Sequence, residues 1–210
     1  MSKIHTAKYD IAVIGAGLVG MVVARCFSAT GQRVLLLSKP ISRPSESGYY
    51  PLTLRARSHA FLQSIGFDLS AIQTSPIKTL NLSARGCFGS ANIQEDSQKA
   101  MGVVMPVEAL AHSVSNRILS DENITCIDAD IEAIEEQADS LILHGIGEGW
   151  ICKRCVLADG AHSNLSKQLP GVQQSYPQLM QSIILPIQSH HWPQGTALIR
   201  QDQQTVYGVV

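Results

Sequence analysis

Three glycines near the amino terminus have the spacing of a phosphate-binding turn. Gly15, Gly17 and Gly20 form the pattern Gly-x-Gly-x-x-Gly. In such a turn the first glycine permits a tight bend, the second lets the backbone approach a pyrophosphate, and the third lets a helix pack closely on a strand. Ala16 and Leu18 lie between them, where a helix begins and backbone N–H groups can point at phosphates. These five residues are therefore candidate ligands of a dinucleotide cofactor.

The glycines stand between segments that predict a strand, a helix and a second strand. Residues 11–14 are wholly apolar, as expected of a strand that is buried on both faces. Residues 18–30 fit a buried helix that Gly31 would end, and residues 34–37 form a second apolar run. A glycine pattern alone is weak evidence, but inside a strand–turn–helix–strand unit it predicts a dinucleotide site. The alternative is a glycine-rich turn in an α/β domain that binds no nucleotide.

The end of the second predicted strand lacks an acidic residue. About 20 residues after the glycines, a carboxylate normally binds a ribose hydroxyl of the dinucleotide. Ser38 occupies this position, and its hydroxyl can still form a hydrogen bond, but without a charge. Lys39 and Arg33 suggest an alternative, in which the site takes the 2′-phosphate of NADP.

Length and composition indicate a globular protein. The chain has 210 residues, of which 45% are hydrophobic and 16% charged, and its net charge is −1. It can bury a sizeable core in one or two domains, and its charge gives no reason to expect nucleic acid as a partner. Residues 1–8 are polar, and no apolar run reaches the roughly 18 residues of a membrane span. We therefore expect a cytoplasmic protein without a signal peptide.

The five cysteines, an odd number, favour a reducing compartment over a disulfide framework. Cys152 and Cys155 form a Cys-x-x-Cys pair, a pattern that also occurs in redox and zinc sites. Side chains three residues apart in a strand point to opposite faces, and the sequence has no second pair or nearby pair of histidines to complete a zinc site. We expect both cysteines to be strand residues, and we expect neither a metal site nor a catalytic side chain.

The rest of the chain predicts an α/β order of elements with a hairpin inserted into it. Residues 58–66 and 107–120 fit helices, and Ser58 is a candidate cap for the first of them. Residues 85–89 fit the turn of the hairpin, and residues 40–51 fit a polar loop. The further expected strands are residues 77–83, 90–94, 124–127, 131–135, 140–144, 151–157, 182–187, 196–200 and 205–210.

Three segments resemble flavoprotein aromatic hydroxylases of the para-hydroxybenzoate hydroxylase type. These segments are DIAVIGAGLVG at residues 10–20, IKTLNLSARGCFG at residues 77–89 and LADGAHS at residues 157–163. The first and third are similar to motifs of the whole superfamily. The second is similar to a strand and turn of the ubiquinone-biosynthesis hydroxylases, and most of all to the 2-polyprenyl-6-methoxyphenol hydroxylase family.

The resemblance implies FAD as the cofactor, NADPH or NADH as the reductant, and a polyprenyl phenol of ubiquinone biosynthesis as the substrate. Asp159 and Gly160, in the third segment, would contact both FAD and the nicotinamide cofactor. The implied partners are other proteins of that pathway, the inner membrane face as a peripheral contact, and further copies of the chain.

The implied architecture is a Rossmann-like FAD-binding domain of the glutathione-reductase type with an inserted, incomplete β-sheet substrate domain. The FAD-binding domain would take residues 1–75 and 96–175, and the substrate domain residues 76–95 and 176–210. The chain ends before the second FAD motif that the family carries. We therefore expect it to self-associate and to lack hydroxylase activity on its own.

Several positions depart from the family pattern. Ser38 stands where the family has a glutamate on the FAD ribose, and Tyr50 where it has an arginine that faces FAD. Pro106 and Val107 replace a Glu-Asn pair at the entry to a helix. Two alternatives follow. One is an inactive remnant or accessory protein of the ubiquinone pathway that keeps the nucleotide-binding fold, and the other is a small NAD(P)-dependent reductase.

Overall fold

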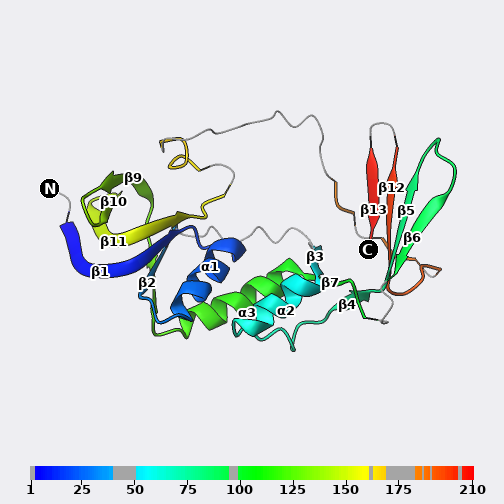
Figure 1. Cartoon of the computed structure of the whole chain (residues 1–210), viewed down its shortest axis with the longest axis horizontal. Coiled ribbons are helices and arrows are strands. Elements are labelled where there is room, and N and C mark those ends of the chain that lie inside the picture. The colour runs from blue at the N-terminus through cyan, green and yellow to red at the C-terminus, as the bar shows by residue number, and fades with distance from the viewer. Residues whose placement is uncertain are drawn as a thin grey trace. The chain divides into compact units, whose positions relative to one another are not determined.

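A computed structural model describes residues 3–39, 51–94, 99–160, 163–168, 183–185, 187–189, 191–202 and 205–210 (Figure 1). The chain divides into two compact units. The first comprises Met1–Ser47 with Ala111–Gln181, and the second comprises Gly48–Leu110 with Ser182–Val210. These units are defined by packing and not by ligand contacts, so the division into an FAD-binding and a substrate domain stays a prediction.

The first unit is built on a six-stranded sheet in the order β8-β2-β1-β11-β10-β9. Neighbours among β8, β2, β1 and β11 run parallel, whereas β11, β10 and β9 form an antiparallel meander. The predicted fold class, an α/β domain of Rossmann type, is confirmed. The elements of this unit are β1 (Lys3–Ile14), α1 (Leu18–Ser28), β2 (Val34–Ser38), most of α3 (Val107–Leu119), β8 (Ile124–Asp128), β9 (Ile131–Glu136), β10 (Leu141–Gly145) and β11 (Glu148–Leu157).

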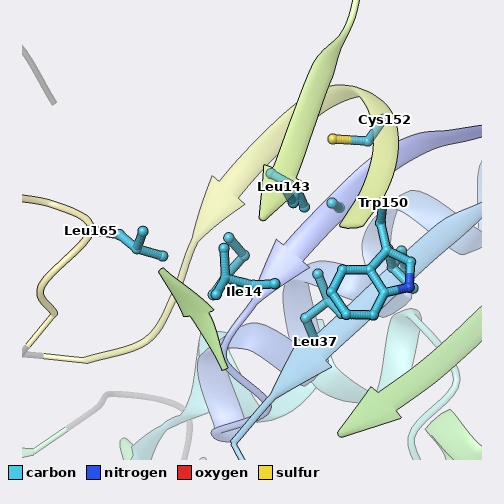
Figure 2. Packing of buried hydrophobic residues seen from close by; sticks show 9 residues of the cluster. Ile14, Leu37, Leu143, Trp150, Cys152 and Leu165 are labelled. Carbon is cyan, nitrogen blue, oxygen red and sulfur yellow. The ribbon is translucent and has the colours of Figure 1, made fainter. Parts of the chain in front are cut away.

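Both faces of the parallel strands are covered by apolar layers. One face belongs to a cluster that joins the parallel strands to the meander, and Figure 2 shows Ile14, Leu37, Leu143 and Trp150 within it. Successive strand residues point to opposite faces, and the alternate positions are also at most 3% exposed, namely Ile11, Val13, Val34 and Leu36. Burial on both faces explains why these segments are continuous apolar runs in the sequence.

β1 begins earlier than its apolar run predicts. The sequence placed this strand at residues 11–14, but Lys3 and His5 also pair with β11, opposite Glu148 and Trp150. The rings of His5 and Trp150 stack with their centroids 5.6 Å apart. The polar start of β1 is therefore held by a partner strand that is distant in the sequence, which local hydrophobicity cannot reveal.

The second unit contains two smaller sheets, ordered β13-β12-β5-β6 and β3-β7-β4. The predicted hairpin is confirmed as β5 and β6, which pair antiparallel around the turn at residues 85–89. β3 and β7 were not predicted as strands. The elements of this unit are β3 (Pro51–Arg55), α2 (Ala56–Ser64), β4 (Ser75–Ile77), β5 (Thr79–Ala84), β6 (Ser90–Gln94), β7 (Gly102–Pro106), β12 (Thr196–Gln201) and β13 (Val206–Val209).

Two further predictions about helices and strands are wrong. α2 begins at Ala56, with Arg55 at its N-cap, so Ser58 lies inside the helix instead of capping it. The described part of the expected strand at residues 182–187 forms no strand, and Ile183 and Leu185 there are exposed. Residues 40–50 of the expected loop, with Tyr50 among them, lie outside the described residues. Among the helices that the structure describes, none is long and apolar enough to cross a membrane.

Candidate functional site

The predicted phosphate-binding turn lies at an edge where four strands end together. Because β8, β2, β1 and β11 run parallel, Asp128, Ser38, Ile14 and Leu157 reach the same edge of the sheet. In open parallel sheets, ligands bind in the crevice outside the carboxyl ends of the strands. The candidate residues of the Gly-rich turn, of the end of β2 and of the Asp-Gly motif are thus brought to one edge.

Gly15 and Gly20 are required by close packing within the turn. Gly15 has a φ of +108°, and its N–H donates a hydrogen bond to the Leu37 carbonyl oxygen at 2.7 Å. A Cβ atom on Gly15 would overlap the backbone of Ala158, and one on Gly20 would overlap the carbonyl oxygen of Gly15. These two glycines therefore shape the turn and bring α1 close to β1, as the sequence pattern predicts.

Gly17 has surroundings that fit a bound pyrophosphate. It is exposed at the N-cap of α1, and a Cβ atom added to it would meet nothing within 4 Å. Within the described residues, no side chain caps this end of α1, and the first turn carries no acidic residue. The N–H groups that begin at Leu18 and the positive end of the helix dipole are therefore available to an anion. Ala16, in the same turn, is half-buried.

β11 brings the Asp-Gly motif to the same turn. The N–H of Ala158 donates to the Ile14 carbonyl oxygen at 2.7 Å, which places Asp159 and Gly160 next to the exit of β1. Both residues are exposed. Gly160 has a φ of +86°, and its carbonyl oxygen accepts a hydrogen bond from the N–H of Ser163 at 3.3 Å. The structure thus places the predicted residues of both motifs together, although it does not test their roles.

Ser38 lies at the end of β2, as predicted, and is half-buried. Its carbonyl oxygen accepts a hydrogen bond from the N–H of Ala129 at 2.7 Å, which ties the ends of β2 and β8 together. The next residue, Lys39, has its ammonium group 2.9 Å from the carboxylate of Asp130. The cation at this edge that was considered for a 2′-phosphate is therefore already paired with a carboxylate.

Arg33 lies at the opposite edge of the sheet, so its predicted role at a 2′-phosphate is wrong. It precedes β2, whose five residues span roughly 15 Å. Its side chain is 3.7 Å from Asp10, and Lys153 lies 2.7 Å from the same carboxylate. The hydrogen bonds from Lys153 and from the backbone of Arg33 hold the pKa of Asp10 below its ordinary value. This group of charges fastens the amino ends of the strands.

Cys152 and Cys155 both lie in β11, as the prediction of strand residues requires. Burial raises the pKa of the Cys152 thiol to about 11 and that of the Cys155 thiol to about 12. Thiols with such values stay protonated at neutral pH and are poor nucleophiles and poor metal ligands. Within the described residues, no group of His, Cys, Asp or Glu side chains has the arrangement of a metal site.

The second unit has a shallow hollow of about 500 Å³ next to the hairpin turn. Leu82 and Ile199 line it from β5 and β12, and Cys87 and Phe88 line it from the turn. Phe88 is fully exposed. The hollow offers an apolar surface to a ligand but, in the residues that line it, no acid or base.

Asp128 is a residue at the candidate site that sequence reasoning missed. It follows directly after the apolar strand predicted at residues 124–127, which is the position where an acidic residue would reach the ligand edge. The sequence alone does not show that Asp128 lies beside the end of β2, because this depends on the order of strands in the sheet.

Solved structures with a similar arrangement of elements include two monooxygenases. The p-nitrophenol 4-monooxygenase PnpA from Pseudomonas putida DLL-E4 matches with a TM-score of 0.61 and 16% identity, over 76% of this chain and 43% of that chain. PqsL from Pseudomonas aeruginosa, described as a probable FAD-dependent monooxygenase, matches with a TM-score of 0.62 and 18% identity, over 81% and 48%. The chain shares the fold of these two monooxygenases.

A reductase-like protein shares this fold. A geranylgeranyl bacteriochlorophyll reductase-like protein from Thermoplasma acidophilum matches with a TM-score of 0.64 and 12% identity, over 95% of this chain and 51% of that chain. The chain thus spans about half the length of these solved structures. No protein-family model and no curated protein matches the sequence. The expected fold of the aromatic hydroxylases is confirmed at this level, and the ubiquinone subfamily stays a prediction.

Proposed function

We propose that this chain binds FAD and forms part of an FAD-dependent monooxygenase that hydroxylates a polyprenyl phenol in ubiquinone biosynthesis. The observation that carries the proposal is the exposed Gly17 at the N-terminus of α1. The space in front of Gly17 is open, and it lies at the carboxyl ends of the parallel strands, where such sheets bind ligands. The chain also shares its fold with monooxygenases. An uncapped helix end with open space in front of it can accept the phosphates of a dinucleotide.

Different residues at this edge of the sheet bind different parts of the cofactor. The backbone around Gly17 and Leu18 binds the pyrophosphate, because its N–H groups and the helix dipole favour an anion there. The end of β2 at Ser38 faces the ribose, and Asp159 with Gly160 contacts the cofactor from the end of β11. Bound FAD supplies the redox chemistry, which takes a hydride from NADPH or NADH and uses O₂ to hydroxylate the phenol.

The substrate class is supported by the hairpin in the second unit. Its turn at residues 85–89 carries the motif that resembles the ubiquinone-biosynthesis hydroxylases, and Phe88 with the hollow beside it gives an apolar surface. A phenol with a polyprenyl tail is largely apolar and is present in membranes. The proposal therefore includes peripheral contact with the membrane and contact with other proteins of the pathway.

One observation favours a second candidate function. Ser38 has no charge to offer a ribose hydroxyl, so the site has lost a contact that the family normally makes. A non-catalytic accessory protein of the ubiquinone pathway that keeps the fold and binds a nucleotide weakly would tolerate this loss.

Titration of the purified chain with FAD, followed by flavin fluorescence, tests the proposal. We expect saturable binding by the parent and none by Gly17→Val, because the valine side chain would occupy the place of the pyrophosphate. Gly208→Val is the matched control, because Gly208 is an exposed glycine of β13 that also has nothing within 4 Å of an added Cβ. Equal affinity of FAD for Gly17→Val and the parent would refute a phosphate site at this turn.

Reduction of the bound flavin separates the two candidate functions. An enzyme of the proposed class should show bleaching of its yellow colour when NADPH or NADH is added without oxygen. Bound flavin that neither nicotinamide reduces would favour the accessory protein.

A further inference from the structure

The end of β8 offers the carboxylate that the end of β2 lacks. β2 and β8 are parallel neighbours in the sheet, and their register places Ser38 opposite Asp128. Adjacent strands are about 4.8 Å apart, and the hydrogen bond from the Ala129 N–H to the Ser38 carbonyl oxygen holds the two ends at this spacing. A short side chain on β8 can therefore reach the space that a longer side chain on β2 would fill.

Ser38 and Asp128 lie on the same face of the sheet. Leu35 and Leu37 belong to the cluster under the meander, and Ile127 packs against that cluster. Because strand side chains alternate between faces, Ser38 and its register partner Asp128 belong to the other face. α1 contacts β1, β2 and β8, and none of its described residues belongs to the cluster under the meander, so the helix covers this other face. Asp128 therefore shares a face with the helix whose N-terminus is the candidate phosphate site.

Among the described residues, Asp128 is the carboxylate beside the end of β2 that is available to a ligand. It is exposed, and within the described part of the chain no ion pair or hydrogen bond engages its carboxylate. Asp130 is close in the sequence, but it pairs with Lys39 at 2.9 Å. Asp159 follows β11, which is separated from β2 by β1.

We propose that Asp128, rather than Ser38, supplies the carboxylate that accepts hydrogen bonds from the hydroxyls of the adenosine ribose. The proposal rests on the dinucleotide site proposed above and assigns one part of its specificity. A carboxylate accepts hydrogen bonds from both ribose hydroxyls and repels a phosphate ester. The site therefore prefers a ribose with a free 2′-hydroxyl over one with a 2′-phosphate.

FAD titrations of Asp128→Asn and Asp130→Asn test the assignment without any measurement of turnover. A charge-assisted hydrogen bond corresponds to about 10- to 100-fold in affinity, so Asp128→Asn should weaken FAD binding by that factor. Asp130→Asn is the matched control, because it removes a nearby carboxylate that already has a partner, and it should leave the affinity within about twofold of the parent.

The ligand provides a second readout that does not depend on how well a variant folds. The parent should bind ADP about tenfold or more tightly than 2′-deoxy-ADP, and Asp128→Asn should lose that preference. Ser38→Glu should raise the affinity for FAD more in the Asp128→Asn background than in the parent, since a second carboxylate beside Asp128 adds repulsion.

The outcomes separate this assignment from the proposed function. Loss of binding in Gly17→Val together with unchanged binding in Asp128→Asn overturns the role of Asp128 and leaves the dinucleotide site standing. The same conclusion follows if Asp128→Asn still prefers ADP over 2′-deoxy-ADP. Equal binding by Gly17→Val and the parent, or no binding of FAD and ADP by the parent, overturns both.

Discussion

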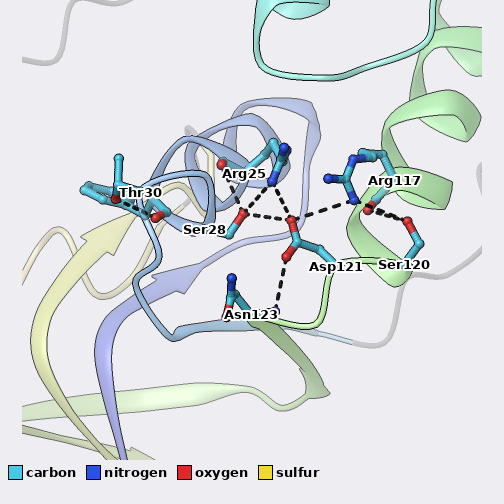
Figure 3. Close-up of polar contacts among 8 residues, drawn as sticks. Arg25, Ser28, Thr30, Arg117, Ser120, Asp121 and Asn123 are labelled. Atoms are coloured by element: carbon cyan, nitrogen blue, oxygen red, sulfur yellow. Dashed lines mark hydrogen bonds and ion pairs between the residues drawn. The ribbon is translucent and has the colours of Figure 1, made fainter.

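The guanidinium group of Arg25, in the last turn of α1, lies 2.7 Å from the carboxylate of Asp121, between α3 and β8 (Figure 3). The same carboxylate accepts hydrogen bonds from the Ser28 hydroxyl at 2.8 Å and from the Asn123 N–H at 3.1 Å. The Asp121 side chain is only 6% exposed. This network fixes the far end of the helix whose first turn forms the candidate phosphate site.

Asp121→Asn should destabilise the protein. The change removes the negative charge of the carboxylate that binds Arg25 and Ser28, so the partly buried guanidinium of Arg25 loses its ion pair with Asp121. A hydrogen bond to a charged group contributes about 1.5–3 kcal/mol, and we expect a loss of that size in the free energy of unfolding by urea. Glu135→Gln, which removes the charge from the exposed contact with His144 at 2.9 Å, should change stability little. Equal losses in the two variants would contradict a special role for the buried network.

The contribution of Asp121 should depend on pH. Burial alone would raise its pKa, but the hydrogen bonds from Ser28 and Asn123 and the charge of Arg25 outweigh it and lower the pKa. A carboxyl group with a lowered pKa in the folded state adds stability above its unfolded value, about 4, and loses it as the pH falls through the folded value. Urea midpoints of the parent should therefore fall more steeply below about pH 4 than those of Asp121→Asn. Parallel curves would argue against this.

Gly20→Ala should lower the stability more than Gly17→Ala does. A methyl group on Gly20 overlaps the Gly15 carbonyl oxygen, so α1 must move away from β1. Overpacking of this kind costs about 1–3 kcal/mol, and thermal denaturation should show it. Gly17→Ala is the matched control because its methyl group meets nothing within 4 Å. The same melting temperature for both variants would show that the helix is not closely packed at Gly20.

Cysteine alkylation should distinguish the strand thiols from the hairpin thiol. At neutral pH, Cys87 should react with iodoacetamide quickly because it is exposed in the turn. Cys152 and Cys155 should react slowly, because burial raises the pKa of their thiols to about 11 and about 12. Mass spectrometry of peptides from native and urea-unfolded protein provides the comparison. Rapid labelling of Cys152 in the native protein would contradict its burial in β11.

Asp159→Ala should weaken FAD binding with little loss of stability. Asp159 is exposed at the end of β11 beside the glycine turn, so the folded chain depends little on its side chain. Asp139→Ala removes an exposed carboxylate in the meander and serves as the control. A large fall in melting temperature without any change in FAD affinity would make Asp159 a structural turn residue.

The local parts of the site can be predicted from the sequence. The order of a strand, three spaced glycines, a helix and a second strand predicts the turn, since each glycine has a local steric reason that the structure shows at Gly15 and Gly20. The hairpin of β5 and β6 was also predictable, because its strands are joined by a short turn at residues 85–89. Such features depend on neighbours in the chain.

Which distant segments meet depends on the tertiary structure and cannot be predicted from local patterns. β3 and β7 escaped prediction because each finds its partner some fifty residues away in a small sheet, and the start of β1 is held by β11. Strand order then placed Asp128 beside Ser38 and moved Arg33 to the far edge. Strands can pair by hydrogen bonds whatever their separation in the sequence, so local patterns predict the strands but not which strands pair.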